Sequence, residues 1–372
     1  MAIIDASEKH KLEMKILIIR FPHLMEQILR KLDNESLVKS IGVARIWKEF
    51  IDDTKYPWVR IVKIPTILQA GDTYLHLAAK HNQIDAFEEI LNGQVKKADL
   101  VNDSGYSPFL VACLFGSLRI AKFLMKKSEE LKIDLSRITN CHSSAFHLAC
   151  IGGNSKLAEM IMKDSIKFQS HSFGTDRFGA NAFHEACKLG NLEIVQMMIK
   201  NLAVTNNIQL NAADWENKTA LHMACDRKKP EVAKLLIEKA SEIKLDLNAR
   251  ARTSNLNAFQ MACISGLASV VEIMLSESNK FEISGGFHLA CREGHINVVE
   301  IFIRKLEDSP KLDFITKDDV NSGFHYAWRA GHTKIVAILK EKSVLLKLDI
   351  SGKQFGIKTG FQLSQIPESD LE

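Results

Sequence analysis

The chain has 372 residues, a formal net charge of +4 at pH 7 and 46% hydrophobic residues. These values are ordinary for a globular protein and exclude a wholly disordered chain. A charge of +4 on so long a chain gives no nucleic-acid-binding signal, and no apolar run approaches the ~20 residues that span a bilayer. Seven cysteines, an odd number with no secretion signal, predict free thiols in a reducing compartment, the cytoplasm or the nucleus.

One seven-residue pattern recurs through the chain and dominates its organisation. The eight clear copies are TYLHLAA (73–79), SPFLVAC (107–113), SAFHLAC (144–150), NAFHEAC (181–187), TALHMAC (219–225), NAFQMAC (257–263), GGFHLAC (285–291) and SGFHYAW (322–328). A ninth copy, TGFQLSQ (359–365), is degraded. Successive copies are mostly 37 or 38 residues apart, with one short step of 28 residues between Gln260 and His288.

The columns of this pattern predict a pair of helices in each repeat. The first position is Thr, Ser or Asn in seven copies, which suits a helix N-cap. Phe or Leu at the third position and Ala at the sixth share one helix face, and the constant alanine indicates a neighbouring helix packed directly against it. A glycine three residues after the pattern, as at Gly190, suits a helix end. A second amphipathic segment follows, as at 192–199.

This pattern resembles the ankyrin repeat, whose T-P-L-H-x-A signature and helix–turn–helix plan match these columns. The resemblance covers residues 68–372 and implies an all-α solenoid of about eight repeats plus the degraded C-terminal copy. Its repeats are joined by fingers, the β-turn hairpins that precede each helix pair. The long period predicts second helices about one turn longer than usual. The 28-residue step predicts a shortened or missing finger around 278–284.

Six of the seven cysteines form one column of the repeat, and six of the thirteen histidines form another. A His and a Cys three residues apart share a helix face, which raises the question of a metal site. However, equivalent residues of stacked helices lie ~10 Å apart, whereas zinc ligands lie ~2.0–2.3 Å from one ion. We therefore expect buried, reduced cysteines and no metal. Cys141, outside the column, is expected to be exposed.

The remaining residues carry no catalytic pattern. The sequence has neither the glycine-rich motifs that cradle phosphates nor a G-x-S-x-G nucleophile turn. We therefore expect a protein that is not an enzyme, that needs no cofactor and that binds no small-molecule ligand.

Residues 1–67 do not follow the repeat. After an N-terminal extension (1–20), residues 21–64 are predicted to form three short helices, the first beginning at Pro22. So small a segment has little core of its own, and it would gain stability by docking onto a partner or onto the first repeat.

The segment 21–64 resembles an F-box. The features that carry this resemblance are Phe21-Pro22 (the family prefers Leu-Pro), Ile28, Leu32-Asp33, Leu37, Val43-x-Arg45-x-Trp47 and a later Trp58. The alternative interpretation is a helical cap for the solenoid with no F-box function.

The F-box resemblance implies docking onto the adaptor subunit of an SCF-type ubiquitin ligase. The residues assigned to this contact are Pro22, Leu24, Ile28, Leu32, Leu37, Val43 and Trp47. The chain would then be the non-catalytic substrate-recognition subunit, whose repeats hold an unidentified target protein near the conjugating enzyme. An ankyrin scaffold with no ubiquitin role is the alternative function.

The ankyrin resemblance implies that partners bind along the concave face, on the finger tips and the exposed ends of the first helices. Apolar side chains at these positions predict the site, because contiguous exposed apolar surface and aromatic anchors are typical of protein interfaces. The predicted groove residues are Tyr106, Leu114, Phe115, Ile151, Phe178, Leu189, Trp215 and Ile264. Alternatively, some of these side chains lie in the core beneath the fingers.

Overall fold

The structure is a computed structural model that describes residues 71–93, 98–164, 168, 174–201, 209–308 and 315–346. The chain divides into two units, Met1–Ile67 and Leu68–Glu372, and every described residue belongs to the second. The predicted extension (1–20), the F-box-like module (21–64) and the ninth copy of the pattern (359–365) lie outside the described residues.

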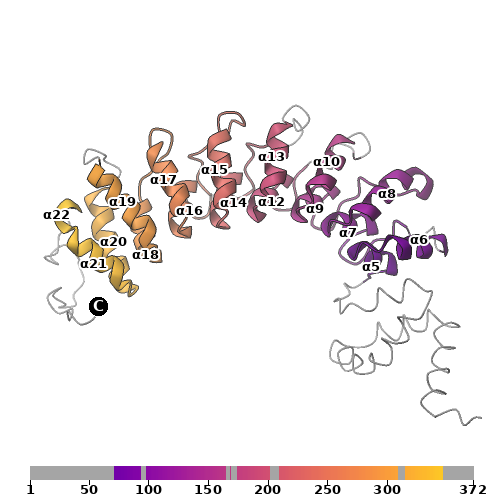
Figure 1. The fold of residues 1–372 in the computed structure, drawn as a ribbon, viewed down its shortest axis with the longest axis horizontal. Coiled ribbons are helices and arrows are strands. Elements are labelled where there is room, and N and C mark those ends of the chain that lie inside the picture. The colour runs from indigo at the N-terminus through magenta and orange to yellow at the C-terminus, as the bar shows by residue number, and fades with distance from the viewer. Residues whose placement is uncertain are drawn as a thin grey trace, which may run out of the picture. The chain divides into compact units, whose positions relative to one another are not determined.

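The described part of the second unit is a row of helix pairs, with α22 (Ser343–Leu346) after the last pair (Figure 1). The first helices of the pairs are α5 (Tyr74–Lys80), α7 (Pro108–Leu114), α9 (Ala145–Ile151), α12 (Ala182–Leu189), α14 (Ala220–Asp226), α16 (Ala258–Ser265), α18 (Gly286–Glu293) and α20 (Lys317–Arg329). The second helices are α6 (Ile84–Gly93), α8 (Leu118–Leu131), α10 (Ser155–Lys163), α13 (Leu192–Lys200), α15 (Pro230–Lys239), α17 (Ala268–Ser276), α19 (Ile296–Asp308) and α21 (Thr333–Glu341). Within the described ranges there are no strands beyond isolated bridges. The predicted all-α ankyrin-type solenoid is confirmed.

The first position of the pattern caps the first helix, as predicted. Ser107 accepts a hydrogen bond from the backbone N–H of Leu110, and Asn257 accepts one from that of Gln260. These bonds satisfy N–H groups that have no partner inside the helix. At the other end, Gly190 takes the left-handed conformation with φ at 80°, which ends α12 without the steric cost that a Cβ would add.

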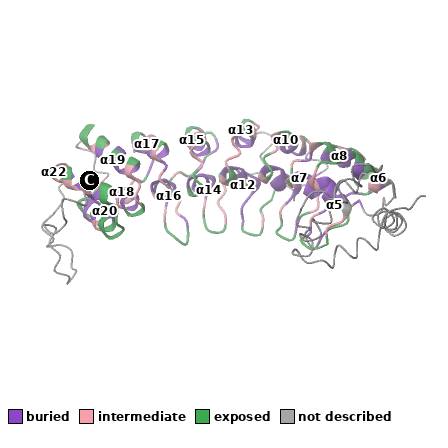
Figure 2. Cartoon of the chain, turned by 60° about the horizontal axis from the view of Figure 1, so that its bottom comes forward, coloured by how far each residue is buried: buried purple, intermediate pink, exposed green. Residues whose placement is uncertain are grey.

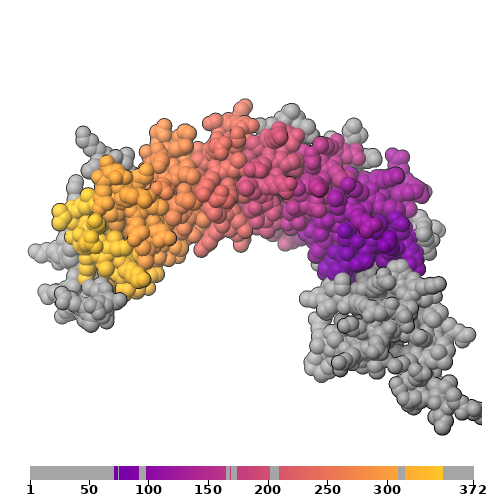
Figure 3. All heavy atoms as spheres, viewed as in Figure 1, coloured from indigo at the N-terminus to yellow at the C-terminus, as the bar shows by residue number. Residues whose placement is uncertain are grey.

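The core lies where each first helix packs on the next, and one small column makes this packing possible. The alanines at the sixth position are fully buried; they are Ala78, Ala112, Ala149, Ala186, Ala224, Ala262, Ala290 and Ala327. The Phe or Leu at the third position is at most 4% exposed in every copy. Figure 2 shows this buried seam along the first helices, with exposed loops projecting from it. Figure 3 shows the repeats packed without a break from α5 to α21.

The prediction that the second helices are about one turn longer than usual is wrong in part. Only α8 and α19, with 14 and 13 residues, are extended, whereas α10, α13 and α15 have nine or ten. After α15 the added residues form a turn instead, held by a bond from the backbone N–H of Leu245 to the carbonyl oxygen of Ala240. Insertions between repeats therefore do not all lengthen a helix.

The last described first helix also begins earlier than the pattern predicts. Ser322 aligns with the N-caps of the other copies but lies inside α20. The cap is Thr316, whose hydroxyl accepts from the backbone N–H of Asp319 at 3.0 Å, while the backbone N–H of Thr316 donates to the Asp319 carboxylate at 3.2 Å. This reciprocal capping box starts the helix before the repeat pattern is reached.

Histidines of the fourth position join two of the first helices, α5 and α12, to the following finger. In α12, Nδ1 of His184 accepts a hydrogen bond from the backbone N–H of Asn181, and Nε2 lies 3.0 Å from the carbonyl oxygen of Ala212 in the next finger. His76 makes the same contact with the carbonyl oxygen of Tyr106, at 2.8 Å. When Nδ1 accepts in this way, the ring is neutral and its proton is on Nε2, which donates to the carbonyl oxygen. Burial accordingly lowers the pKa of His76 and His184, and that of His147 to about 4.

Neutral buried histidines should make the array sensitive to acid. An unfolded histidine titrates near pH 6.5, so below that pH the unfolded chain binds more protons than the folded one. The contribution of His147 is fully present above pH 6.5 and falls by about 3 kcal/mol as the pH drops to 4. We expect His147→Gln to reduce this loss, because Gln260 fills the same column with equivalent bonds to the Asn257 N–H and the Ser284 carbonyl. Urea unfolding of the wild type and of His147→Gln between pH 7 and 4 measures this difference in the free energy of unfolding. The same pH dependence in both proteins would contradict the role given to His147.

No described helix has the length and apolar character needed to cross a bilayer.

Candidate functional site

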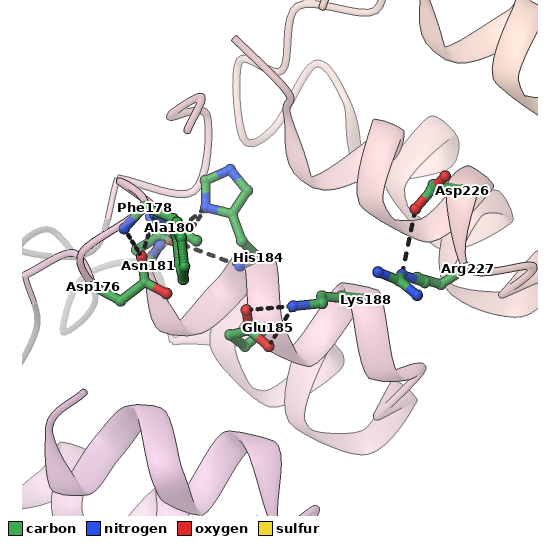
Figure 4. Close-up of polar contacts among 9 residues, drawn as sticks. All are labelled: Asp176, Phe178, Ala180, Asn181, His184, Glu185, Lys188, Asp226 and Arg227. Atoms are coloured by element: carbon green, nitrogen blue, oxygen red, sulfur yellow. Dashed lines mark hydrogen bonds and ion pairs between the residues drawn. The ribbon is translucent and has the colours of Figure 1, made fainter. Parts of the chain in front are cut away.

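The finger side of the array is built from tight hairpin turns that recur once per repeat. In the finger at 176–180, the Asp176 carboxylate accepts hydrogen bonds from the backbone N–H groups of Phe178 and Ala180 (Figure 4). Asp214 does the same for Glu216 and Lys218 in the finger at 214–218. The carboxylate thus fixes the backbone of each tip through a short-range turn, and both tip side chains project from a rigid base.

Neighbouring finger tips are joined by one backbone hydrogen bond each. The N–H of Arg177 donates to the carbonyl of Cys141, that of Trp215 to Phe178, and that of Arg252 to Glu216, at 3.1, 3.1 and 2.6 Å. The bonds repeat in register, so the tips of successive fingers line up. The finger at 251–256 is the last in this series among the described residues. The short chain 277–285 leads directly into α18, as the predicted missing finger requires.

The tips of two neighbouring fingers carry the two most exposed aromatic side chains of the described residues. Phe178 and Trp215 are 57% and 64% exposed. The guanidinium of Arg177 lies 4.7 Å from the centre of the Phe178 ring, a cation–π distance. We call the set Arg177, Phe178, Trp215, Glu216 and Arg252 the fingertip ridge.

The ends of the first helices form a second, less continuous row. Phe115, after α7, is 49% exposed and has the Lys80 ammonium 5.1 Å from its ring centre. Leu189, at the end of α12, is 40% exposed. Gly152 occupies the equivalent place between them, and Arg227 follows after α14. The apolar positions of this row are therefore interrupted by glycine and charge.

The structure places the eight predicted groove residues on the surface, and none of them is buried. Phe115, Phe178, Leu189 and Trp215 are exposed, whereas Tyr106, Leu114, Ile151 and Ile264 are partly covered. Phe178 and Trp215 are brought together at neighbouring tips. Phe115 lies two repeats away from Leu189, so the eight do not form one apolar stripe. Their role in binding stays a prediction.

Charges near the helix ends are largely paired. Lys188 lies 2.9 Å from Glu185 within α12, and Arg227 lies 3.3 Å from Asp226 (Figure 4). On the fingers, Lys218 pairs with Glu216 at 2.5 Å. These pairs neutralise the carboxylates that lie closest to the fingertip ridge.

The cysteine column behaves as a packing column. Its six cysteines are buried and reduced, and Cys141 is exposed, as predicted. Burial raises the pKa of the Cys225 thiol to about 12, so it stays protonated and unreactive at neutral pH. Within the described ranges, no cluster of His, Cys, Asp and Glu has the arrangement of a metal site.

Comparison with known families identifies the repeats. The sequence matches the family described as ankyrin repeats (3 copies) over residues 75–172, 146–250 and 199–285, which together span more than half of the chain. The chain belongs to the ankyrin-repeat family. Among solved structures, one similar chain comes from a complex of a predatory endopeptidase from Bdellovibrio bacteriovorus with an immunity protein. It is 18% identical, with a TM-score of 0.45, and the match covers 56% of this chain and 99% of that chain. No curated protein matches this sequence.

Ankyrin repeats are protein-interaction modules, so the surface of the ankyrin array is the candidate site. The family match does not include residues 21–64, and the F-box-like module stays a prediction. Sequence reasoning missed the turn-forming role of Asp176 and Asp214 and the place of Arg252 at a tip. The signal was present as Asp followed three residues later by Gly179 or Asn217, a spacing typical of tight turns.

Gly179 should be essential for the geometry of the ridge. It has φ at +78°, and a Cβ there would collide with Cδ1 of Trp215. Gly331 has the same backbone conformation, with φ at +77°, but open space around it. We expect Gly331→Ala to cost ~1–2 kcal/mol for the left-handed backbone alone. Gly179→Ala should cost more and also shift the tryptophan fluorescence. Equal losses and unchanged emission in the two variants would contradict this contact.

Proposed function

We propose that this ankyrin protein binds a protein partner on its finger side and acts as the substrate-recognition subunit of an SCF-type ubiquitin ligase. The observation that carries the binding part is the exposure of Phe178 and Trp215 on finger tips that the backbone holds in line. Large aromatic side chains held on rigid supports are typical interface anchors, because little conformational entropy is lost when they are buried.

The ligase part of the proposal is supported by the sequence of residues 21–64. Pro22, Leu32-Asp33 and Val43-x-Arg45-x-Trp47 occur there in the order found in F-boxes. An F-box followed by an interaction domain would bring the bound target to the conjugating enzyme and raise the local concentration of its lysines. The alternative is an ankyrin scaffold whose N-terminal segment caps the array and binds no adaptor.

Adaptor binding separates the two functions. We expect the full chain to bind the purified SCF adaptor at micromolar concentration. Replacing Pro22 and Leu24 together by Glu should abolish this binding, because charge at the contact would be desolvated. The melting transition of the ankyrin array should remain. Failure of the wild-type chain to bind the adaptor would leave the scaffold function.

The finger side is tested independently of the adaptor. We expect Phe115→Ala with Trp215→Ala to weaken binding to captured partner proteins by about 2 kcal/mol or more. The stability should change by no more than ~0.5 kcal/mol, because both side chains are exposed. Val344→Ala is the matched control, since Val344 is 91% exposed and lies on α22. A large drop in melting temperature would mean that Phe115 and Trp215 are core residues.

A further inference from the structure

Two cations flank the aromatic pair of the fingertip ridge. Arg177 and Arg252 are both exposed, and neither has a carboxylate partner among the described residues. The formal charges of the three fingers balance, with Asp176, Asp214 and Glu216 against Arg177, Lys218 and Arg252. What distinguishes the two arginines is that neither forms an ion pair within the described ranges.

The carboxylates of the same fingers form no direct ion pair with Arg177 or Arg252 among the described residues. Asp176 and Asp214 each accept two backbone hydrogen bonds inside their own turns. Glu216, the only acidic member of the ridge, pairs with Lys218 at 2.5 Å. The groups on the ridge that can still form hydrogen bonds with a ligand are therefore the guanidinium donors of Arg177 and Arg252, one on either side of the two aromatic rings.

The dimensions of the ridge fit an extended chain. The backbone bonds of Trp215 to Phe178 and of Arg252 to Glu216 place the tips of three fingers in sequence. Neighbouring repeats are ~10 Å apart, so Arg177 and Arg252 are separated by roughly 20 Å. At about 3.3 Å per residue, six extended residues cover that distance. A single chain could thus contact both arginines and both rings.

We propose that the fingertip ridge binds a short extended segment of a protein partner, in which an aromatic or large aliphatic side chain is flanked on both sides by Asp or Glu. The apolar side chain packs between Phe178 and Trp215, and the carboxylates accept hydrogen bonds from Arg177 and Arg252. This inference rests on the proposed binding of a protein on the finger side and names the chemistry of the segment that is recognised.

The ridge is less suited to a nucleic acid than to an acidic peptide. Affinity for nucleic acid comes from many phosphate contacts, whereas the ridge offers two arginines and also contains Glu216. A segment with one carboxylate on each side of its apolar side chain matches the two arginines.

Selection from a random 12-residue peptide display library on the full chain tests the inference. Enriched peptides should combine Asp or Glu with Trp, Phe or Leu, and the best synthetic peptide should bind more weakly as salt is raised. Arg177→Glu with Arg252→Glu should reduce its affinity at least ~10-fold, and Trp215→Ala should do so as well. Arg119→Glu with Lys126→Glu is the matched control: it makes the same change in net charge on exposed positions of α8 and should leave affinity unchanged.

Three results would overturn the inference. These are enrichment of basic or uncharged peptides, an equal effect of the ridge and control charge reversals, and binding of a ten-nucleotide oligothymidine as tight as that of the peptide. If captured partner proteins still depend on Phe115 and Trp215 but not on Arg177 and Arg252, the proposed protein-binding function stands and the acidic segment is wrong. If they depend on neither pair, the function proposed for the finger side fails too.

Discussion

Every other feature of the array depends on a helix-to-helix contact that has room only for alanine. The sixth position of the pattern is fully buried in all eight copies, and a larger side chain there would push the first helices apart. Because that contact repeats, the distance between repeats is set once and copied along the chain. The fingers have the same spacing as the helices, and this spacing allows the backbone hydrogen bonds between neighbouring finger tips. Function on the finger side is thus a consequence of packing on the core side.

The fold could be predicted from the sequence because the repeat gives eight independent observations of one environment. A buried alanine, a capping residue and a glycine at the helix end each have a distinct physical cause, and each recurs at a fixed place. The same reasoning failed where one repeat differs from the rest. Ser322 fits the capping column, but Thr316 and Asp319 supply a stronger local cap. A period of 38 residues gives the length of an insertion but not its conformation, and after α15 it is a turn.

The candidate site was predicted less completely, for a different reason. Whether a side chain is exposed can be inferred from the equivalent position in the other repeats. All eight predicted side chains are indeed at the surface. Which of them become neighbours depends on the turn geometry of particular fingers. Phe178 and Trp215 occupy different places in their turns, yet one backbone bond brings the two residues together. The pairing state of Arg177 and Arg252 depends on the acidic side chains around them, which the repeat pattern does not specify.

The histidine column is interrupted in two of the eight clear copies, by Leu110 and by Gln260. Among the helices before α16, α5 and α12 are joined to the following fingers by histidine rings whose pKa is lowered by burial. In α16 the same contact is made by an amide, which has no proton to gain. In a solenoid each repeat is stabilised only by its neighbours. The stability of different repeats can therefore depend on pH to different extents. Mild acid would then open the array from its first repeats, and the boundary of hydrogen-exchange protection would lie near α16. The stability of the repeats before α16 would therefore depend on pH more strongly than that of the repeat that contains the amide.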